Sequence, residues 1–199
     1  MSTLSSSRAA RRASHTNTDR TFLLVLIGAT LVILGTVAVV NWTANRSIAP
    51  AASPPLADLL PLAEPVNPIV GFHNMERMSN LNTPPRPVEA GTPQANVDLP
   101  LSAWDWGVIP AMPPVAQTFP IQNTGDQPLL ITNVVTSCGC TTAQLSSSVI
   151  PAGQRADLVV TFDPNFHATS GPVTRLVWLE TNDPDQPVVE LRMDANVAP

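Results

Sequence analysis

The residues best suited to chemistry are Cys138 and Cys140, the only two cysteines in the chain. In an extended strand, residues i and i+2 have Cα atoms nearly 7 Å apart, at roughly 3.3 Å rise per residue. Disulfides require about 4.4–6.8 Å, so a bridge needs a bend, which Gly139 permits. The spacing leaves three interpretations open: a structural disulfide or buried thiols, a redox-active pair, and a soft-metal contact.

A second cluster with soft ligands lies within residues 72–78, where His73 is followed by Met75 and Met78. Imidazole and thioether groups together suit Cu(I). Alternatively, the two methionines form an apolar pair that docks a helical turn onto a partner. Copper is therefore an alternative cofactor, with Cys138 and Cys140 as its remaining candidate ligands.

Residue sets typical of catalysis do not occur at interpretable spacings. The three histidines, His15, His73 and His167, fall in separate segments. The sequence contains neither a Gly-rich phosphate loop nor the C-x-x-C spacing of thioredoxin-type redox sites. We therefore predict that the protein is not an enzyme.

Two tryptophans, Trp104 and Trp106, occupy positions i and i+2 of a predicted strand and so share a face. Large aromatic side chains usually pack in a core or along a sheet edge. The alternative is that the pair contacts a partner protein.

The elements that position these residues begin with an apolar run, residues 21–40, which contains no charge. As a helix at 1.5 Å per residue, a run of this length spans about 30 Å, the thickness of a bilayer core. With Trp42 at the interface, we predict a transmembrane helix over 21–42. It exceeds the roughly 7–15 residues of a signal-peptide core, so an uncleaved anchor is favoured over a cleaved signal.

The charge distribution gives the expected orientation and excludes one class of partner. Residues 1–20 carry +3 (four Arg, one Asp), whereas residues 41–199 carry −8 (six Arg, fourteen Asp or Glu). Positive flanks stay inside, which predicts a cytoplasmic tail over 1–20 and an extracytoplasmic remainder in a single-pass cell-membrane protein. The acidic, base-poor remainder argues against nucleic acid as a partner.

Residues 43–100 are rich in proline, with 11 of the chain's 22 prolines between Ser47 and Pro100. Proline removes backbone donors and restricts the preceding residue, so we predict an irregular extracytoplasmic stalk. Residues 101–199 instead show short alternating apolar stretches separated by turn residues. Six strands are predicted from this pattern, and six to eight fit a sandwich: 104–109, 115–122, 129–135, 156–162, 173–181 and 187–197.

Several motifs in this part of the chain resemble a known family. They are Trp106-Gly107-Val108, Asn123-Thr124-Gly125-Asp126, Leu129-Leu130-Ile131, Ser137-Cys138-Gly139-Cys140-Thr141-Thr142, Pro151-Ala152-Gly153, Phe162-Asp163-Pro164 and Thr181-Asn182-Asp183-Pro184. Over about 100–197 the sequence is similar to the bacterial domain-of-unknown-function family numbered 1573. The resemblance implies an all-β immunoglobulin-like sandwich of the major-sperm-protein type, an exported protein and no established catalytic activity.

The sequence thus predicts a membrane-anchored binding or assembly module. It would contact lipid through 21–42 and dock on another membrane or envelope protein, through the exposed strand edges of an open sandwich. The alternative is a copper- or thiol-handling envelope protein that uses Cys138 and Cys140.

Overall fold

The computed structural model describes residues 27, 29 and 53–199, and the last of these ranges forms an all-β domain of ten strands. The strands are β1 (Ile69–His73), β2 (Val97–Asp98), β3 (Ala103–Ile109), β4 (Val115–Asn123), β5 (Leu129–Thr136), β6 (Thr141–Leu145), β7 (Val149–Ile150), β8 (Arg155–Phe162), β9 (Gly171–Thr181) and β10 (Val188–Val197). A short helix, α2 (Met75–Ser79), and two 3-10 turns, η1 (Leu56–Asp58) and η2 (Pro164–His167), complete the domain.

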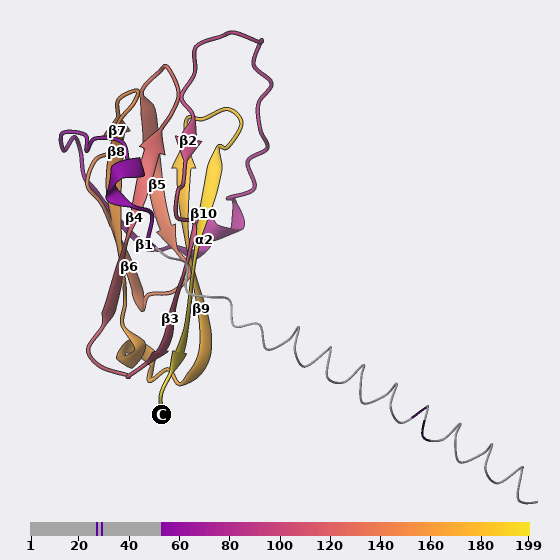
Figure 1. The fold of residues 1–199 in the computed structure, drawn as a ribbon, viewed down its shortest axis with the longest axis vertical. Helices are drawn as coiled ribbons and strands as arrows, with labels where there is room; N and C mark the ends of the chain where they lie inside the picture. Colours follow the sequence, from indigo (N-terminus) through magenta and orange to yellow (C-terminus); the bar gives the residue numbers. More distant parts are fainter. Residues whose placement is uncertain (1–26, 28, 30–52) are drawn as a thin grey trace, which may run out of the picture. The chain divides into compact units, whose positions relative to one another are not determined.

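The strands form one curled sheet in the order β2-β4-β8-β6-β1-β5-β9-β10-β3, with β7 paired to β5. Figure 1 shows the two layers that this curl produces, with β4, β6 and β8 in one and β3, β9 and β10 in the other. The fold therefore agrees with the all-β, immunoglobulin-like class expected from the sequence.

The core lies between the two layers and is built from alternate residues of their strands. In β10, residues 189, 191, 193, 195 and 197 are buried, as the alternation of the sequence predicts. The first three share a core cluster with Phe119 and Ile121 of β4 and Leu158 of β8, which have no exposed surface. Burying side chains of this size contributes about 1.5–3 kcal/mol each.

All six predicted strands are present, with bounds that differ by at most two residues. Four further strands, β1, β2, β6 and β7, were not predicted. Strand β6 reads Thr-Thr-Ala-Gln-Leu, and its buried positions hold Thr141, Ala143 and Leu145. Because small or polar residues fill two of those positions, its alternation carries little hydrophobic contrast.

The predicted boundary between stalk and domain, at residue 101, differs from the structure. Residues 53–199 belong to one compact unit. Within 53–100, Ala63, Ala95 and Val97 are buried against the sandwich, whereas residues 82–93 are exposed. Ala63 N donates to Arg155 O (2.8 Å), and Arg155 N donates to Pro61 O (2.9 Å). Leu60 N donates to Gln122 Oε1 at 2.6 Å. Extended, proline-rich chain suits this role, because it lies along a sheet edge without having to form a helix.

Strand β1 connects the two layers, since its first half pairs with β6 and its second half with β5. Gly71 pairs antiparallel with Ala143, and Phe72 pairs parallel with Val135. The crossing requires a close approach: a Cβ at position 71 would lie 2.4 Å from Val134 Cγ1. A segment predicted as irregular stalk thus supplies the strand that joins the sheet.

The predicted membrane span, 21–42, lies outside the described residues apart from Ile27 and Ala29. Residues 27, 29 and 53–199 include no helix with the length and apolar character needed to cross a bilayer.

Candidate functional site

The two cysteines are joined by a disulfide in the loop between β5 and β6, with their Cα atoms 5.1 Å apart. The loop backbone is held independently of the sulfur atoms. Thr141 N donates to Cys138 O (3.1 Å), Asp163 N donates to Cys140 O (2.9 Å), and Ser137 N donates to Leu176 O (2.9 Å). These bonds connect the loop to β6, to the end of β8 and to β9.

The two sulfur atoms lie in different surroundings. Cys140 is buried, with 3% of its surface exposed, and belongs to a small second core with Ile109, Phe162 and Val197. Cys138 is half-buried, and the adjoining Gly139 is exposed. The loop therefore presents one sulfur toward solvent and holds the other against the core.

A cation lies beside the buried sulfur. Arg175 Nε donates to Cys140 Sγ at 3.1 Å, and its guanidinium lies 5.0 Å from the centroid of the Phe162 ring. Burial lowers the pKa of Arg175, but a guanidinium remains protonated at any physiological pH. Among the described residues, Arg175 has no carboxylate partner within ion-pair distance.

The structure places the predicted copper ligands in different surroundings. The sulfur atoms of Cys138 and Cys140 are bonded to each other, and His73 Nδ1 lies 3.0 Å from Thr136 O. Met75 is 68% exposed, whereas Met78 is half-buried. Within 53–199 there is no group of three or more His, Cys, Asp or Glu side chains that could hold a metal. A copper site formed by these residues therefore stays a prediction.

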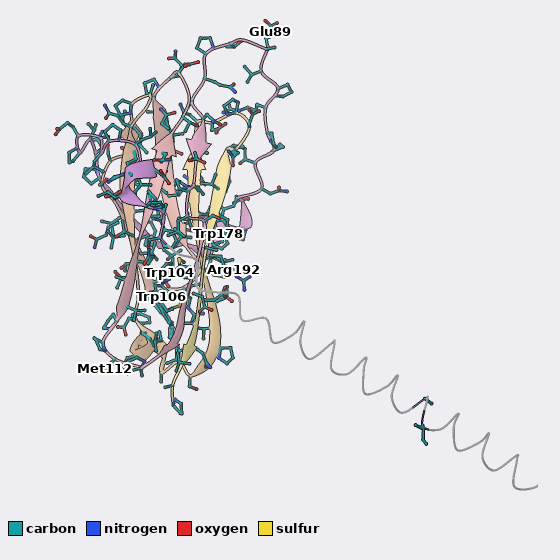
Figure 2. The ribbon with its side chains drawn as sticks, viewed as in Figure 1. Glu89, Trp104, Trp106, Met112, Trp178 and Arg192 are labelled. Atoms are coloured by element: carbon teal, nitrogen blue, oxygen red, sulfur yellow. A yellow bond between two sulfur atoms is a disulfide. The ribbon has the colours of Figure 1, made fainter. Side chains whose placement is uncertain are left out.

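Trp104 and Trp106 lie half-buried on β3, toward the core side of that strand (Figure 2). Trp106 stacks on Phe162 with 6.1 Å between ring centroids. Trp104 Nε1 has no hydrogen-bond partner among the described residues. Both indoles thus make core contacts, and their role as a partner contact stays a prediction.

The outer edge of β3 is protected against strand pairing. Gly107 has φ +66, and its N–H donates to Asp105 Oδ1 at 2.8 Å. The pairing with β10 also shifts register between Asp194 and Asn196. A bulge is a known way of blunting an edge, and Asp105 occupies one backbone donor of the strand. The open edges invoked from the sequence are therefore a weaker basis for docking than the sheet faces.

The outward face of β1, β6, β8 and β4 carries no charge over two complete rows. The cross-strand register places Val70, Gln144, Val159 and Thr118 in one row, and Thr142, Thr161 and Ala116 in the next. Val70 is 63% exposed and Phe72, two residues along β1, is 60% exposed. We call this surface the neutral face; its residues are Val70, Phe72, Ala116, Thr118, Thr142, Gln144, Val159 and Thr161.

The outward face of β9 and β10 is built differently, and we call it the charged face. Trp178 Nε1 donates to Glu190 Oε2 (2.8 Å), and Arg192 Nε donates to Asp194 Oδ2 (2.8 Å). Arg77 of α2 lies 3.4 Å from Glu180. Figure 2 labels Trp178 and Arg192 on this side of the domain. The residues of the charged face are Thr174, Trp178, Glu180, Glu190, Arg192 and Asp194.

Sequence reasoning missed Arg175 and the neutral face for different reasons. The contact between Arg175 and Cys140 joins residues 35 apart in sequence, and no local pattern signals it. For the neutral face, a signal was present: Ile69-Val70-Gly71-Phe72 is a short β-branched and aromatic run, which favours a strand. Its position among prolines suggested a stalk instead.

The fold defines the class of this protein: an all-β, immunoglobulin-like sandwich with a short disulfide at one end. Residues 99–197 match the family described as "Protein of unknown function (DUF1573)", and the chain belongs to that family. The family predicted from the motifs around Cys138 and Cys140 is therefore confirmed. None of the curated proteins compared with the sequence matches it.

Solved structures give partial matches. A protein of unknown function from Porphyromonas gingivalis W83 is 21% identical with a TM-score of 0.48, over 51% of this chain and 46% of that one. The Vibrio cholerae VesB protease is 15% identical, with a TM-score of 0.41 over 52% and 32%. An ASH/PapD-like domain of human CEP192 is 10% identical, with a TM-score of 0.43 over 56% and 93%. The chain thus spans less than half the length of the first two.

Proposed function

We propose that this protein is a membrane-anchored, extracytoplasmic binding module whose neutral face docks on another membrane or envelope protein, without catalysis of its own. The proposal rests on one observation: two rows of outward side chains without charge, in a domain rich in carboxylates. Residues 53–199 contain five Arg and fourteen Asp or Glu, a net charge of −9. Outward strand positions tolerate charge, as the charged face demonstrates.

Charge depletion combined with exposed apolar side chains is typical of the centre of a protein–protein contact. Interface cores are poor in charged residues and rich in aromatic ones, and contiguous exposed apolar surface marks interaction sites. Phe72 and Val70 supply such surface on β1, and Val159 of β8 lies in the same row on the other side of Gln144. The flanking Thr and Gln side chains have donors and acceptors that a neutral partner surface can satisfy.

The length of the tether indicates which partners are within reach. If residues 21–42 span the membrane, residues 43–52 alone separate that span from the domain that begins at Ser53. Ten residues extend at most about 35 Å, so the domain stays close to the membrane surface. A short tether raises the effective concentration of partners in the same membrane. We therefore propose the extracytoplasmic part of another membrane protein as the occupant.

The test introduces one positive charge on each outer face of the full chain in its native membrane. Val159→Arg places a guanidinium at the centre of the neutral face, where docking would bury it without a counter-charge. Asn196→Arg adds the same charge at an exposed position of β10, on the outer side of the other layer. A photo-crosslinker in place of Phe72 reports the partner directly.

We expect a crosslinked complex from position 72 and at least a tenfold loss of that complex in Val159→Arg, with Asn196→Arg close to the unsubstituted chain. Unfolding midpoints of both variants establish that the domain is intact. Equal yields from the two arginine variants would refute docking through the neutral face.

A further inference from the structure

We propose that the Cys138–Cys140 disulfide is a thiol–disulfide exchange site, at which an external dithiol protein attacks Cys138 and Cys140 is the leaving sulfur. This site lies in the β5–β6 loop, two residues before Thr142 of the neutral face, and it adds a reaction to the proposed binding function. Three features of the loop support it: unequal access to the two sulfur atoms, a cation at the buried one, and a backbone fixed without the bridge.

Access selects the atom that is attacked. Exchange requires a thiolate to approach a disulfide sulfur directly, and 97% of the surface of Cys140 is covered. Cys138 is half-buried, beside an exposed glycine that has no side chain to obstruct approach. The ring of Phe166 lies nearby, 3.5 Å from where a Cβ of Gly139 would stand, and Phe166 is itself 59% exposed. An incoming thiolate therefore reaches Cys138 first.

Charge selects the atom that leaves. A sulfur leaves more readily when its thiolate is stabilised, and neighbouring cations stabilise thiolates. Arg175 Nε already donates to Cys140 Sγ at 3.1 Å. The guanidinium is held in place by the Phe162 ring and by Nη1 donating to Thr174 O at 2.9 Å. Since no carboxylate among the described residues neutralises Arg175, its charge remains available to the sulfur.

The loop is held by hydrogen bonds that do not require the disulfide. Besides the three backbone bonds to neighbouring strands, Thr136 Oγ1 donates to Cys138 O (3.1 Å), and Leu176 N donates to Ser137 Oγ (2.9 Å). Cys140 N donates to Cys138 Sγ at 3.1 Å, a bond that a Cys138 thiolate also accepts. Because a three-residue bridge closes a very short loop, its own contribution to stability is small. Opening it leaves the fold in place.

The exchange balances as follows. One thiolate of the dithiol protein attacks Cys138 Sγ, the Cys138–Cys140 bond breaks, and its electron pair leaves on Cys140 Sγ beside Arg175. The second thiol of the donor loses its proton and attacks its own sulfur in the mixed disulfide. That attack releases Cys138 as a thiolate, which takes up a proton. Two electrons pass to this chain, and the donor protein becomes a disulfide.

The first test identifies the accessible sulfur, using the full chain in detergent and an aromatic disulfide reagent as the probe. In Cys140→Ser the remaining thiol is Cys138, and in Cys138→Ser it is Cys140. We expect an aromatic disulfide reagent to react with Cys138 at least tenfold faster, because burial shields Cys140. A faster reaction at Cys140 would overturn the assignment of the attacked sulfur.

The second test measures how fast dithiothreitol opens the bridge when Arg175 is changed. We expect Arg175→Gln to slow reduction by about threefold to tenfold, since a less stabilised thiolate departs more slowly. Arg175→Lys keeps the positive charge and should restore most of the rate. Arg192→Gln, on the charged face, should not change it.

Unfolding curves of the reduced and oxidised chains separate this exchange from a structural role. We expect both forms to unfold in similar cooperative transitions. Unchanged reduction rates in Arg175→Gln, or loss of the folded domain on reduction, would each refute the proposal. Neither outcome depends on the neutral face, so the proposed function can fail or stand separately.

Discussion

The two outer faces of this sandwich are made of the same kind of secondary structure but have opposite chemical character. On the charged face, neighbouring strands are linked by side chains, as Trp178 is to Glu190 and Thr174 is to Asp194. On the neutral face, the part of the chain that the structure describes has no side-chain hydrogen bond between the cross-strand neighbours Gln144 and Val159. Folding requires only that the inward positions be apolar. The difference between the outward faces therefore points to what each one contacts.

The two faces also depend on different parts of the chain. The charged face needs only the β9–β10 hairpin, whose strands pair over their whole length. The neutral face includes β1, which comes from the proline-rich segment and connects the two layers at Gly71. A single change in β1 should therefore affect one face and spare the other.

The largest expected effect comes from Gly71→Val. The new Cβ would lie 2.4 Å from Val134 Cγ1 and 3.0 Å from the Val134 carbonyl oxygen, so β1 must move. Overpacking of this kind typically costs 1–3 kcal/mol, and we expect about 3 kcal/mol here because backbone as well as side chain is in the way. Urea unfolding of the full chain, followed by tryptophan fluorescence, measures the loss.

Gly139→Ala serves as the matched control, because its Cβ would meet the Phe166 ring at an ordinary 3.5 Å. If Gly71→Val leaves stability unchanged, β1 does not connect the layers as described. Crosslinking from position 72 should also disappear in Gly71→Val, whereas contacts of the charged face persist.

The contrast between β1 and the six predicted strands explains which parts of the fold can be predicted from the sequence. Strands with large residues at alternate positions, such as Val189, Leu191 and Met193 of β10, carry their own signal. Strand β1 is five residues long and is flanked by proline at position 68. Its place is set by tertiary pairing with β5 and β6, which no local pattern encodes.

The candidate sites follow the same division. The disulfide loop was recognisable from Cys138-Gly139-Cys140, yet the spacing left its oxidation state open. Its chemistry depends on Arg175, which comes from β9 and reaches the sulfur only in the folded domain. The neutral face likewise exists only once four strands are aligned. The residue types predicted that reactive side chains are present. Only the fold shows which of them lie in contact.

A smaller loss of stability is expected from a substitution on the charged face. Trp178→Phe removes the hydrogen bond from Nε1 to Glu190 Oε2, 2.8 Å long, while keeping an aromatic ring. Hydrogen bonds to charged groups contribute about 1.5–3 kcal/mol when shielded. Because Glu190 is exposed, we expect a loss of only about 1 kcal/mol, measured by urea unfolding.

Val70→Thr on the neutral face provides the corresponding control, since Val70 is 63% exposed and its side chain forms no hydrogen bond. It should change stability by less than about 0.5 kcal/mol, the usual range for exposed positions. An equal loss from both substitutions would mean that cross-strand bonds do not distinguish the two faces.

The smallest expected effect is on how stability depends on pH. Partial burial opposes ionisation of Asp194, but hydrogen bonds from Arg192 and Thr174 and the charge of Arg192 outweigh it, and its pKa is lowered. A carboxyl whose folded pKa is depressed stabilises the fold above its unfolded pKa, about 3.9. That contribution is lost as pH falls through the folded pKa. Stability measured from neutral pH downward should thus decline below about pH 4, and less steeply in Asp194→Asn. Exposure and salt screening keep the difference to a few tenths of a kcal/mol.

The neutral face supplies the control, because it has no titrating group. Thr142→Asn should therefore leave the decline in stability below about pH 4 unchanged. An equal change in both variants would show that the carboxylates of the charged face do not set this pH dependence.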